Sequence, residues 1–339
     1  MQDQPEVLVR FGGRLDVTDW QRRHALGEVP DAWPYGLDRM AAHGIRVTPA
    51  PVYTGNEQLA RLARAAGRFQ WLEARTKAGK PDVVLCWDER VGVPAAWQSS
   101  MVLTGVIWLT DEHSGRIRRI LGGSGLRRAH RVWSLSSAQL PVLRDVFGIP
   151  QQRLVHVPFG IDADFFTPGG EPTPGLVVSA GNDRHRDHST LVTAAGRLKD
   201  PDVRLELATR HPVEVPSELG VRHSELTHPQ MRDLYRRGAV TVVALRPNLH
   251  VSGISVTLEA MACARPVVVT DTPGMRDYVT HGGTGLLVPP GDVEALAAAV
   301  AELLADPQRA REMGAAARRD VERRFSTQVQ AGHLAALAR

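Results

Sequence analysis

The sequence predicts an α/β protein of two domains, each built on a sheet of buried strands. Its 339 residues are enough for two hydrophobic cores of ordinary size. Short runs rich in β-branched residues, such as 81–87 (PDVVLCW) and 266–270 (PVVVT), fit strands buried on both faces. Segments with helical periodicity alternate with these runs, and a content of 43% hydrophobic and 23% charged residues is typical of globular proteins.

Part of the net charge of +4 comes from residues 116–131, which include six arginines. Two interpretations of this run stay open. It is either a solvated helix face or a surface for peripheral contact with an anionic membrane or an acidic acceptor. No recognition helix or aromatic-interleaved motif accompanies the charge, so we do not expect nucleic acid as a partner.

The two cysteines, Cys86 and Cys263, lie in apolar contexts, and we expect them to be buried without forming a disulfide or a metal site. The first residues lack a signal-peptide pattern, and no apolar segment approaches the length of a membrane span. We therefore expect a cytoplasmic protein, with a peripheral position at the inner membrane face as the alternative.

The first half of the chain alternates between expected strands and helices. Gly12 and Gly13 follow the first strand, where glycines let the backbone approach a ligand or turn sharply. The polar loop 14–36 is either an acceptor-binding element or a connection. The other expected elements are strands at 6–11, 45–51, 81–87 and 101–110, a helix at 36–43 closed by Gly44, and a helix within 55–80.

Residues 248–292 carry the clearest functional pattern. Ser252, Gly253 and Ser255 lead into an apolar run typical of a helix, whose first turn would present unpaired N–H groups and the positive end of the helix dipole to an anion. Glu259 lies farther along this helix, within reach of a ribose hydroxyl. The strand 266–270 and a turn follow, and open α/β sheets bind ligands at such strand ends.

This stretch resembles the donor-nucleotide site of retaining glycosyltransferases of family 4. The residues that carry the resemblance are 259–262 (EAMA), 266–268 (PVV), 272–274 (TPG) and 284–288 (TGLLV), together with 158–166 (PFGIDADFF). The resemblance implies the GT-B fold, in which two Rossmann-like domains face each other across a cleft and a C-terminal helix crosses back to the first domain. The implied parts are an acceptor-side domain at 1–167, a nucleotide-sugar-binding domain at 168–323 and the returning helix at 324–339.

The resemblance also implies site residues. Arg186 takes the place of the family's lysine beside the donor diphosphate, where a fixed cation would stabilise the charge on the leaving group without a metal or another cofactor. Asp111 or His113 would face the donor sugar, with a surface histidine as the alternative. The expected catalytic residues are Arg186, His113, Asp111 and Glu259, and the expected donor-binding residues are Gly12, Gly13, Gly181, Asn182, Arg184, Arg186, Leu226, His250, Ser252, Gly253, Ile254, Ser255 and Glu259.

One departure from the family pattern concerns the donor sugar. The family has two glutamates, and the position eight before Glu259 is Val251. His250 could take the place of the missing glutamate and hydrogen-bond a sugar hydroxyl, or it could be a histidine packed under the loop. Ala264 stands where glycine is common, and Asp277 where glutamate is frequent.

The resemblance implies a hexosyltransferase that moves a sugar from a nucleotide-diphosphate sugar, bound as UDP or GDP, to a hydroxyl acceptor with retention. No nucleophile–base motif, P-loop or carboxylate pair suggests another chemistry. Two alternatives stay open, a nucleotide-sugar-binding protein that has lost catalysis and a GT-B nucleotide-sugar epimerase. The sequence leaves the acceptor undefined.

Overall fold

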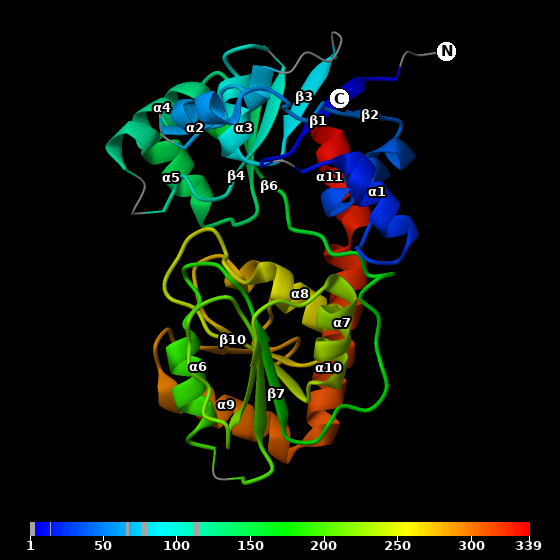
Figure 1. Ribbon diagram of the computed structural model, residues 1–339, viewed down its shortest axis with the longest axis vertical. Helices are drawn as coiled ribbons and strands as arrows, with labels where there is room; N and C mark the ends of the chain where they lie inside the picture. Colours follow the sequence, from blue (N-terminus) through cyan, green and yellow to red (C-terminus); the bar gives the residue numbers. More distant parts are fainter. Residues whose placement is uncertain are drawn as a thin grey trace. The chain divides into compact units, whose positions relative to one another are not determined.

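The computed structural model describes residues 4–13, 15–65, 68–75, 81–99, 101–111, 115–198 and 200–339. Contacts within the chain define two compact units (Figure 1). The first unit comprises the residues up to Arg23, Ala32–Pro158 and Thr327–Arg339, and the second comprises His24–Asp31 and Phe159–Ser326. The first unit is therefore assembled from segments at both ends of the chain.

The first unit is built on a parallel six-stranded sheet of order β2-β1-β3-β4-β5-β6. Its strands are β1 (Glu6–Arg10), β2 (Arg46–Pro49), β3 (Val83–Cys86), β4 (Val102–Val106), β5 (Arg131–Ser134) and β6 (Leu154–His156). Its helices are α1 (Val17–Ala25), η1 (Pro34–His43), α2 (Glu57–Ala65), η2 (Glu73–Arg75), α3 (Glu89–Ala95), α4 (Arg116–Leu126), α5 (Gln139–Asp145), η3 (Gln151–Arg153) and α11 (Thr327–Leu337).

The second unit repeats this architecture with a parallel six-stranded sheet of order β12-β11-β10-β7-β8-β9. Its strands are β7 (Leu176–Ala180), β8 (Arg204–Ala208), β9 (Gly220–His223), β10 (Val240–Val243), β11 (Val267–Thr270) and β12 (Leu286–Val288). Its helices are α6 (His188–Ala195), α7 (His228–Arg237), α8 (Ile254–Ala262), η4 (Met275–Asp277), α9 (Val293–Ala305) and α10 (Pro307–Arg324).

Several strands are buried throughout, because helices cover both faces of a parallel sheet. All residues of β3, β4, β7, β10, β11 and β12 are buried, in agreement with their runs of valine and leucine. Side-chain caps begin several of the helices. Asp187 accepts a hydrogen bond from the Thr190 N–H at the start of α6, and Thr227 with Gln230 forms a capping box on α7.

The order of strands fixes where each sheet can bind a ligand. In the second unit, the chain runs outward from β7 through β8 to β9 and then returns to β10 on the other side of β7. The boundary between β7 and β10 is a topological switch point, and ligands bind there at the carboxyl ends of the strands. The loops that follow β7 and β10 contain Arg186 and His250.

The predicted fold class is confirmed, and the differences are local. The expected strand 101–110 is wrong beyond Val106, where the chain turns. The expected loop 14–36 contains the helix α1. Residues 36–43 form part of a 3₁₀ helix, which Tyr35 and Gly36 interrupt near its start because both have positive, non-helical φ. Gly44 closes that helix with φ 73°, as predicted. The helical pattern of 55–80 gives a helix that ends at Ala65, and 76–80 lie outside the described residues.

The C-terminal helix α11 packs against η1 within the first unit, as the fold class predicts. Both predicted buried cysteines, Cys86 and Cys263, are buried and carry free thiols. Among the described residues, no helix combines the length and the apolar character needed to cross a membrane.

Candidate active site

The loops after β7 and β10 are joined by backbone hydrogen bonds at the switch point of the second sheet. The Asp187 N–H donates to the Ala244 carbonyl at 2.9 Å, and the Arg246 N–H donates to the His185 carbonyl at 2.7 Å. Because these bonds hold both loops, Arg186, which lies between the acceptor His185 and the donor Asp187 on the first loop, has a fixed backbone. Its side chain is therefore placed by the fold and does not depend on a flexible loop.

Arg186 is a buried cation with unused hydrogen-bond donors. The residue is only 7% exposed, and within the described part of the chain its Nε and Nη1 atoms have no hydrogen-bond partner. The backbones of Gly181 and Gly253 approach the guanidinium so closely that a Cβ at either position would collide with it. Burial lowers the pKa of Arg186, an effect that nearby Tyr235, Asp183 and Glu259 oppose, but an arginine remains charged at physiological pH. An anion at this point would satisfy donors that the protein leaves unused.

The first turn of α8 adds backbone donors beside this cation. Gly253 stands at the N-cap with φ 86°, and the predicted Ile254 and Ser255 form the first turn. Ser252 precedes it, and its N–H donates to the Asn248 Oδ1 atom at 2.9 Å. The N–H groups of a helix's first turn have no partner within the helix. The Ile254 N–H donates to the Val251 carbonyl at 3.2 Å, and the N–H groups that follow it in this turn can bind an anion.

Val251 adopts φ 50°, a left-handed conformation that is a genuine outlier for a β-branched residue. It is fully buried, and it lies between the predicted residues His250 and Ser252. Strain of this kind persists only where the surrounding structure imposes it, and it concentrates at functional sites. The conformation turns the chain into the glycine cap of α8.

Glu259 lies in α8, beyond its first turn, and forms a hydrogen bond with Tyr235. The fully buried Tyr235 hydroxyl donates to the Glu259 Oε2 atom at 2.8 Å. Burial raises the pKa of Glu259 to about 7, although the Tyr235 hydrogen bond and the charge of Arg186 both lower it. The carboxyl group is thus poised to change its charge near neutral pH.

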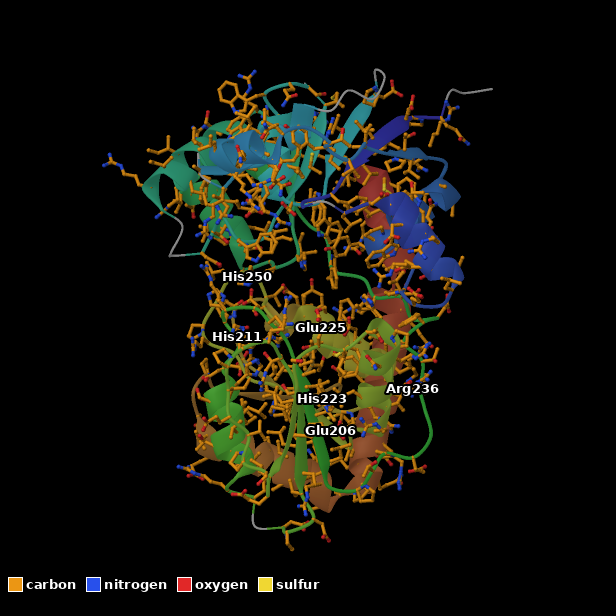
Figure 2. All side chains as sticks on the ribbon, in the orientation of Figure 1. Glu206, His211, His223, Glu225, Arg236 and His250 are labelled. Atoms are coloured by element: carbon orange, nitrogen blue, oxygen red, sulfur yellow. The ribbon has the colours of Figure 1, made fainter. Side chains whose placement is uncertain are left out.

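A pocket of about 260 Å³ opens at the carboxyl ends of β7, β8 and β9. Figure 2 labels Glu225, which belongs to its wall. The structure brings four of the predicted residues together here. The pocket is lined by Ala180, Gly181, Asn182, Ala208, Arg210, Ser224, Glu225, Leu226, Met231, Tyr235, Val256 and Glu259. The predicted Arg184 is exposed and is not part of this lining.

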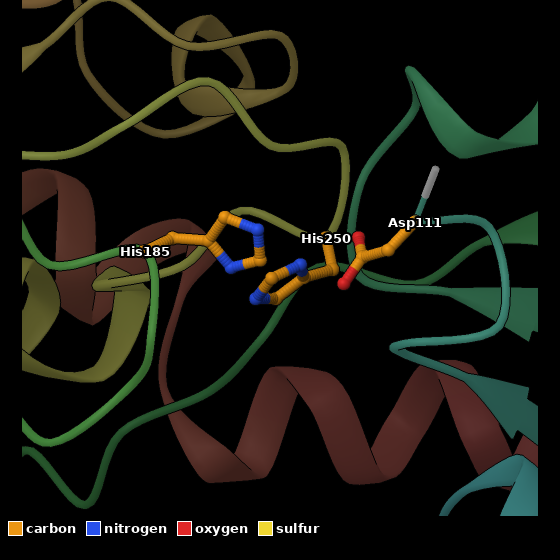
Figure 3. Close-up of side chains that lie close together, drawn as sticks. All are labelled: Asp111, His185 and His250. Atoms are coloured by element: carbon orange, nitrogen blue, oxygen red, sulfur yellow. The ribbon is translucent and has the colours of Figure 1, made fainter. Parts of the chain in front are cut away.

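His250 belongs to a buried polar cluster around Asp183. One Asp183 carboxylate oxygen accepts the Ser252 hydroxyl at 2.8 Å and lies 3.1 Å from the His185 Nδ1 atom, and the other lies 3.6 Å from the His250 Nε2 atom. The two imidazole rings lie edge to face, with centroids 4.9 Å apart (Figure 3). Burial would raise the pKa of Asp183, but its contacts with His250, His185 and Ser252 outweigh this and hold the pKa well below the usual range.

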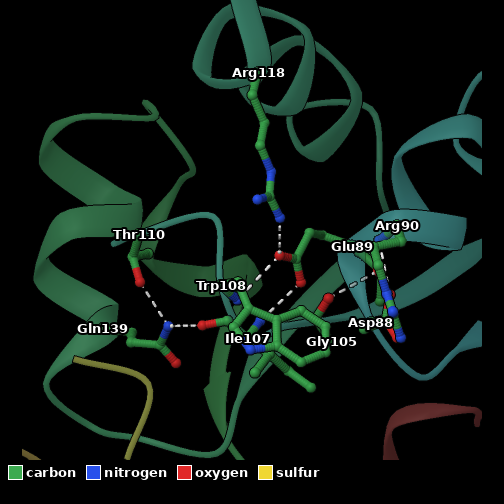
Figure 4. A network of polar contacts seen from close by, with 10 residues as sticks. Asp88, Glu89, Arg90, Gly105, Ile107, Trp108, Thr110, Arg118 and Gln139 are labelled. Carbon is green, nitrogen blue, oxygen red and sulfur yellow. Dashed lines mark hydrogen bonds and ion pairs between the residues drawn. The ribbon is translucent and has the colours of Figure 1, made fainter. Parts of the chain in front are cut away.

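Three of the predicted residues, Gly12, Gly13 and Asp111, lie at the carboxyl end of the first unit's own sheet. The chain segment that leads to Asp111 is held by buried Glu89, whose carboxylate accepts the N–H groups of Ile107 at 2.9 Å and Trp108 at 3.0 Å and pairs with Arg118 at 3.1 Å (Figure 4). Asp111 itself is buried, whereas His113 lies outside the described residues.

Gly12 and Gly13 follow β1 at the switch point of the first sheet, between β1 and β3. A side chain on Gly12 would collide with the ion pair of Asp88 and Arg90, which explains the glycine at this position. The Gly13 N–H donates to the Gln70 Oε1 atom at 3.1 Å, and its φ of 84° favours glycine.

Sequence reasoning missed the roles of Tyr235 and Asp183. Tyr235 precedes Glu259 by 24 residues and lies on another helix, so no local pattern links the two. Asp183 lies in a loop that the sequence shows to be polar. The available signal for its role was that the donors of His185, His250 and Ser252 need an acceptor, and Asp183 could supply one. Both pairings depend on the tertiary contact of separate loops and helices.

Comparisons with known proteins agree with this geometry. Residues 174–306 match the family model of the glycosyl transferases group 1. The chain is 29% identical to the D-inositol 3-phosphate glycosyltransferase of Kribbella flavida, over 93% of this chain and 87% of that protein. It is 32% identical to the GDP-mannose-dependent alpha-(1-6)-phosphatidylinositol monomannoside mannosyltransferase of Mycolicibacterium smegmatis, over 50% of this chain and only 52% of that protein.

Solved structures show the same fold over nearly the whole chain. Sucrose-phosphate synthase from Thermosynechococcus elongatus superposes with a TM-score of 0.72 at 21% identity, covering 99% of this chain and 98% of that one. The Anabaena protein HepE, solved in complex with UDP and glucose, gives a TM-score of 0.66 at 16% identity, covering 98% and 99%. The two Rossmann-like units therefore define a GT-B protein. Residues 174–306 match the group 1 glycosyltransferases, as the sequence pattern predicts.

Proposed function

We propose that this protein transfers a hexose from a nucleoside-diphosphate sugar to a hydroxyl acceptor, with retention of the anomeric configuration and without a metal ion. The observation that carries the proposal is the buried Arg186 beside the first turn of α8, whose Nε and Nη1 atoms lack partners among the residues that the structure describes. The family match supports the reaction class, and the relatives' names identify glycosyl transfer as their activity.

The donor would lie along the switch point of the second unit. Its diphosphate would contact the Arg186 guanidinium and the N–H groups of the first turn of α8, its ribose would hydrogen-bond Glu259, and its base would enter the pocket beside Leu226. As the sugar–phosphate bond breaks, negative charge grows on the leaving diphosphate. A fixed cation and fixed N–H dipoles stabilise that charge more in the transition state than in the bound substrate.

The sugar end of the donor would involve His250 and the residues of the first unit. His250 is held by Asp183, which would fix the imidazole's orientation and tautomer and thereby the group it offers to a sugar hydroxyl. Asp111 or His113 would act on the donor sugar, as the family resemblance implies. Glu259 would contact the nucleotide, and its negative charge, when ionised, would partly offset the positive charge of Arg186.

We also propose a cytoplasmic location, because this is where nucleotide-sugar donors are generally available. Peripheral contact with an anionic membrane through the first part of the arginine run has some support. Ile117 and Ile120 are 66% and 59% exposed on α4, beside the basic residues Arg116 and Arg119. Such a combination of apolar and cationic side chains can bind a membrane surface.

The test begins with a thermal-shift screen of UDP-, GDP-, dTDP- and ADP-sugars, since a ligand that binds only the folded state raises the unfolding midpoint. The stabilising donor is then incubated with candidate hydroxyl acceptors, with and without EDTA, and the product anomer is assigned by NMR. An α-linked product from an α-linked donor, formed at an unchanged rate in EDTA, supports the proposal. An inverted product, or loss of turnover restored by a divalent cation, would overturn the corresponding part.

A further inference from the structure

A second polar cavity lies at the amino ends of the strands in the first unit, at the edge of that sheet opposite its switch-point loops. It has a volume of about 510 Å³ and is formed by the chain after α3, the end of α4 and the turn η3 before β6. The cavity is lined by Ala96, Trp97, Gln98, Ser99, Arg127, Arg128 and Arg153. Neither the donor residues nor Asp111 belong to it.

The arginines of this cavity are anchored without being neutralised. Arg127 donates from Nη1 to the Phe147 carbonyl at 2.9 Å, Arg128 from Nε to the Ala96 carbonyl at 3.3 Å, and Arg153 from Nη1 to the Arg127 carbonyl at 3.1 Å. Within the described part of the chain, no carboxylate forms an ion pair with any of the three. Backbone carbonyls fix the position of a guanidinium but leave its charge and most of its five N–H donors available.

The local field is correspondingly positive. His130 lies between Leu126 at the end of α4 and the start of β5, and its pKa is lowered by partial burial and by the charges of Arg131 and Arg153. Three like charges around one cavity repel each other, so the folded protein gains most from a ligand that carries negative charge. An anion with several oxygens could bind to more than one guanidinium at once.

Trp97 gives the cavity an aromatic wall. Its side chain is 48% exposed, which is unusual for a large apolar group, and the Arg128 Cζ atom lies 4.4 Å from the ring centroid. The stacked guanidinium keeps both groups in place and leaves ring surface available for contact with a flat or cyclic part of a ligand. Ser99 and Gln98 add hydroxyl and amide groups at the rim.

We infer that this cavity binds a phosphorylated ligand that carries a ring, with the phosphate at Arg127, Arg128 and Arg153 and the ring against Trp97. The phosphate could belong to a free phosphorylated sugar or to a lipid headgroup with a cyclic polyol, because both offer the same chemistry. The run 116–131 is then not one uniform surface. Its first arginines lie on α4, whereas Arg127 and Arg128 belong to an anion site.

The binding experiment uses the full chain with Arg186→Gln as the background, so that the proposed donor site does not bind the probe. Inorganic pyrophosphate and glucose 6-phosphate are titrated by calorimetry. Replacing all three arginines by glutamine keeps an amide donor for the backbone carbonyls while removing the charges. We expect this triple replacement to lower the binding affinity for both ligands by about tenfold or more. Unchanged affinity for both ligands in a folded triple variant would overturn the inference.

Two further variants separate the parts of the inference. Trp97→Ala should lower the affinity for glucose 6-phosphate several-fold and leave the affinity for pyrophosphate unchanged. An equal effect on both affinities would overturn the role of Trp97 in binding the ring. Arg144→Gln changes an arginine of the same unit that pairs with Asp145, and it should have no effect on either ligand. Circular dichroism and the unfolding midpoint of each variant show that the fold is retained.

The source of the phosphate is decided with vesicles. Co-sedimentation with phosphatidylinositol vesicles, and with phosphatidylcholine vesicles as the neutral control, is measured for the chain with and without the triple replacement. Loss of phosphatidylinositol binding in the triple variant identifies a lipid headgroup as the source, whereas binding of soluble ligands alone identifies a free phosphorylated sugar. If neither the lipid headgroup nor the soluble ligands bind at the cavity, the inference is overturned.

Discussion

Both sheets are parallel and six-stranded, but the two units bury charge in opposite ways at the carboxyl ends of these sheets. In the first unit, the fully buried Glu89 accepts the N–H groups of Ile107 and Trp108 and pairs with Arg118. In the second unit, two nitrogen atoms of the buried Arg186 have no hydrogen-bond partner in the described ranges of the chain. The Glu89 carboxylate forms a closed set, because both of its oxygens accept hydrogen bonds, and a closed set fixes a loop. The Arg186 guanidinium forms an open set, which is complete only when a ligand supplies the missing acceptors.

The largest effect on stability is expected where the network is closed. Glu89→Ala removes the acceptor of two backbone N–H groups and leaves Arg118 without its partner, so we expect unfolding to become easier by about 3–5 kcal/mol. The free energy of unfolding of the first unit, measured in urea, checks this.

The matched control for Glu89 is the exposed pair of Arg144 and Asp145. Arg144→Ala should leave the unfolding curve unchanged, because exposed ion pairs contribute little. Equal effects of the two substitutions would show that the Glu89 network does not hold the loop.

The largest effect on turnover is expected where the network is open. Arg186→Met removes the diphosphate cation, and we expect the turnover number to fall by about 10²–10³. The same change should raise the unfolding midpoint of the ligand-free protein, because an apolar group replaces a buried charge whose Nε and Nη1 atoms have no partner among the described residues. Steady-state kinetics and thermal unfolding of one sample measure both.

Arg186→Lys is the control that retains the charge. It should recover part of the lost turnover, although a lysine cannot form the paired hydrogen bonds of a guanidinium. A variant in which both turnover and stability collapse would mean that Arg186 is a structural residue, and the contrast with Glu89 would disappear.

The ionisation of Glu259 gives a smaller effect that depends on pH. Its pKa is raised from the ordinary 4.5 to about 7, so the carboxylate form, which accepts ribose hydroxyls more strongly, becomes populated only as the pH rises through about 7. We expect nucleoside affinity to rise over that range, and the raised pKa also means that this group lowers folded-state stability as the pH rises from about 4.5 to 7.

Tyr235→Phe sharpens this prediction, because its hydroxyl stabilises the ionised form of Glu259. Its loss should raise the pKa further and move the affinity curve to higher pH. Glu259→Gln cannot titrate and should give a flat curve. Calorimetry with a nucleoside, which carries no phosphate of its own, measures all three proteins, and a curve for Tyr235→Phe that coincides with the parent would remove Tyr235 from this role.

The smallest effect concerns the end of α8. Ala264 has φ 55°, and the Arg265 N–H donates to the Ala260 carbonyl at 3.0 Å, as in a helix ending that favours glycine. Ala264→Gly should therefore stabilise the protein by up to about 1 kcal/mol. Ala262→Gly, inside the same helix, should destabilise it by about 1 kcal/mol. Urea unfolding of both variants checks the sign of each change in the free energy of unfolding. A loss of stability in both variants would show that Ala264 is not strained.

The sequence predicted the parts of this comparison that depend on local pattern. The valine-rich strands, Gly44 and the start of α8 were predictable because each follows from the properties of a few adjacent residues. Arg186 was placed through the family resemblance. The donor pairing of Tyr235 with Glu259 was not predictable, because residues on two helices meet only in the folded unit.

Two of the errors in the first unit have a physical cause. Residues 107–110 are apolar enough to continue a strand, yet Glu89 takes the N–H groups of Ile107 and Trp108 and turns the chain away. The helix α1 has only Val17 buried, so it lacks the apolar stripe that would mark it in the sequence. Both outcomes are decided by contacts that a reading of adjacent residues does not include.

The packing of α11 on η1 has a consequence for how the protein is made. The first unit needs residues 327–337 to cover η1, although most of its chain leaves the ribosome before the second unit is synthesised. The second unit can therefore complete its core while the first still exposes the surface that α11 will cover. Assembly of this protein follows the order of its contacts and differs from the order of its sequence.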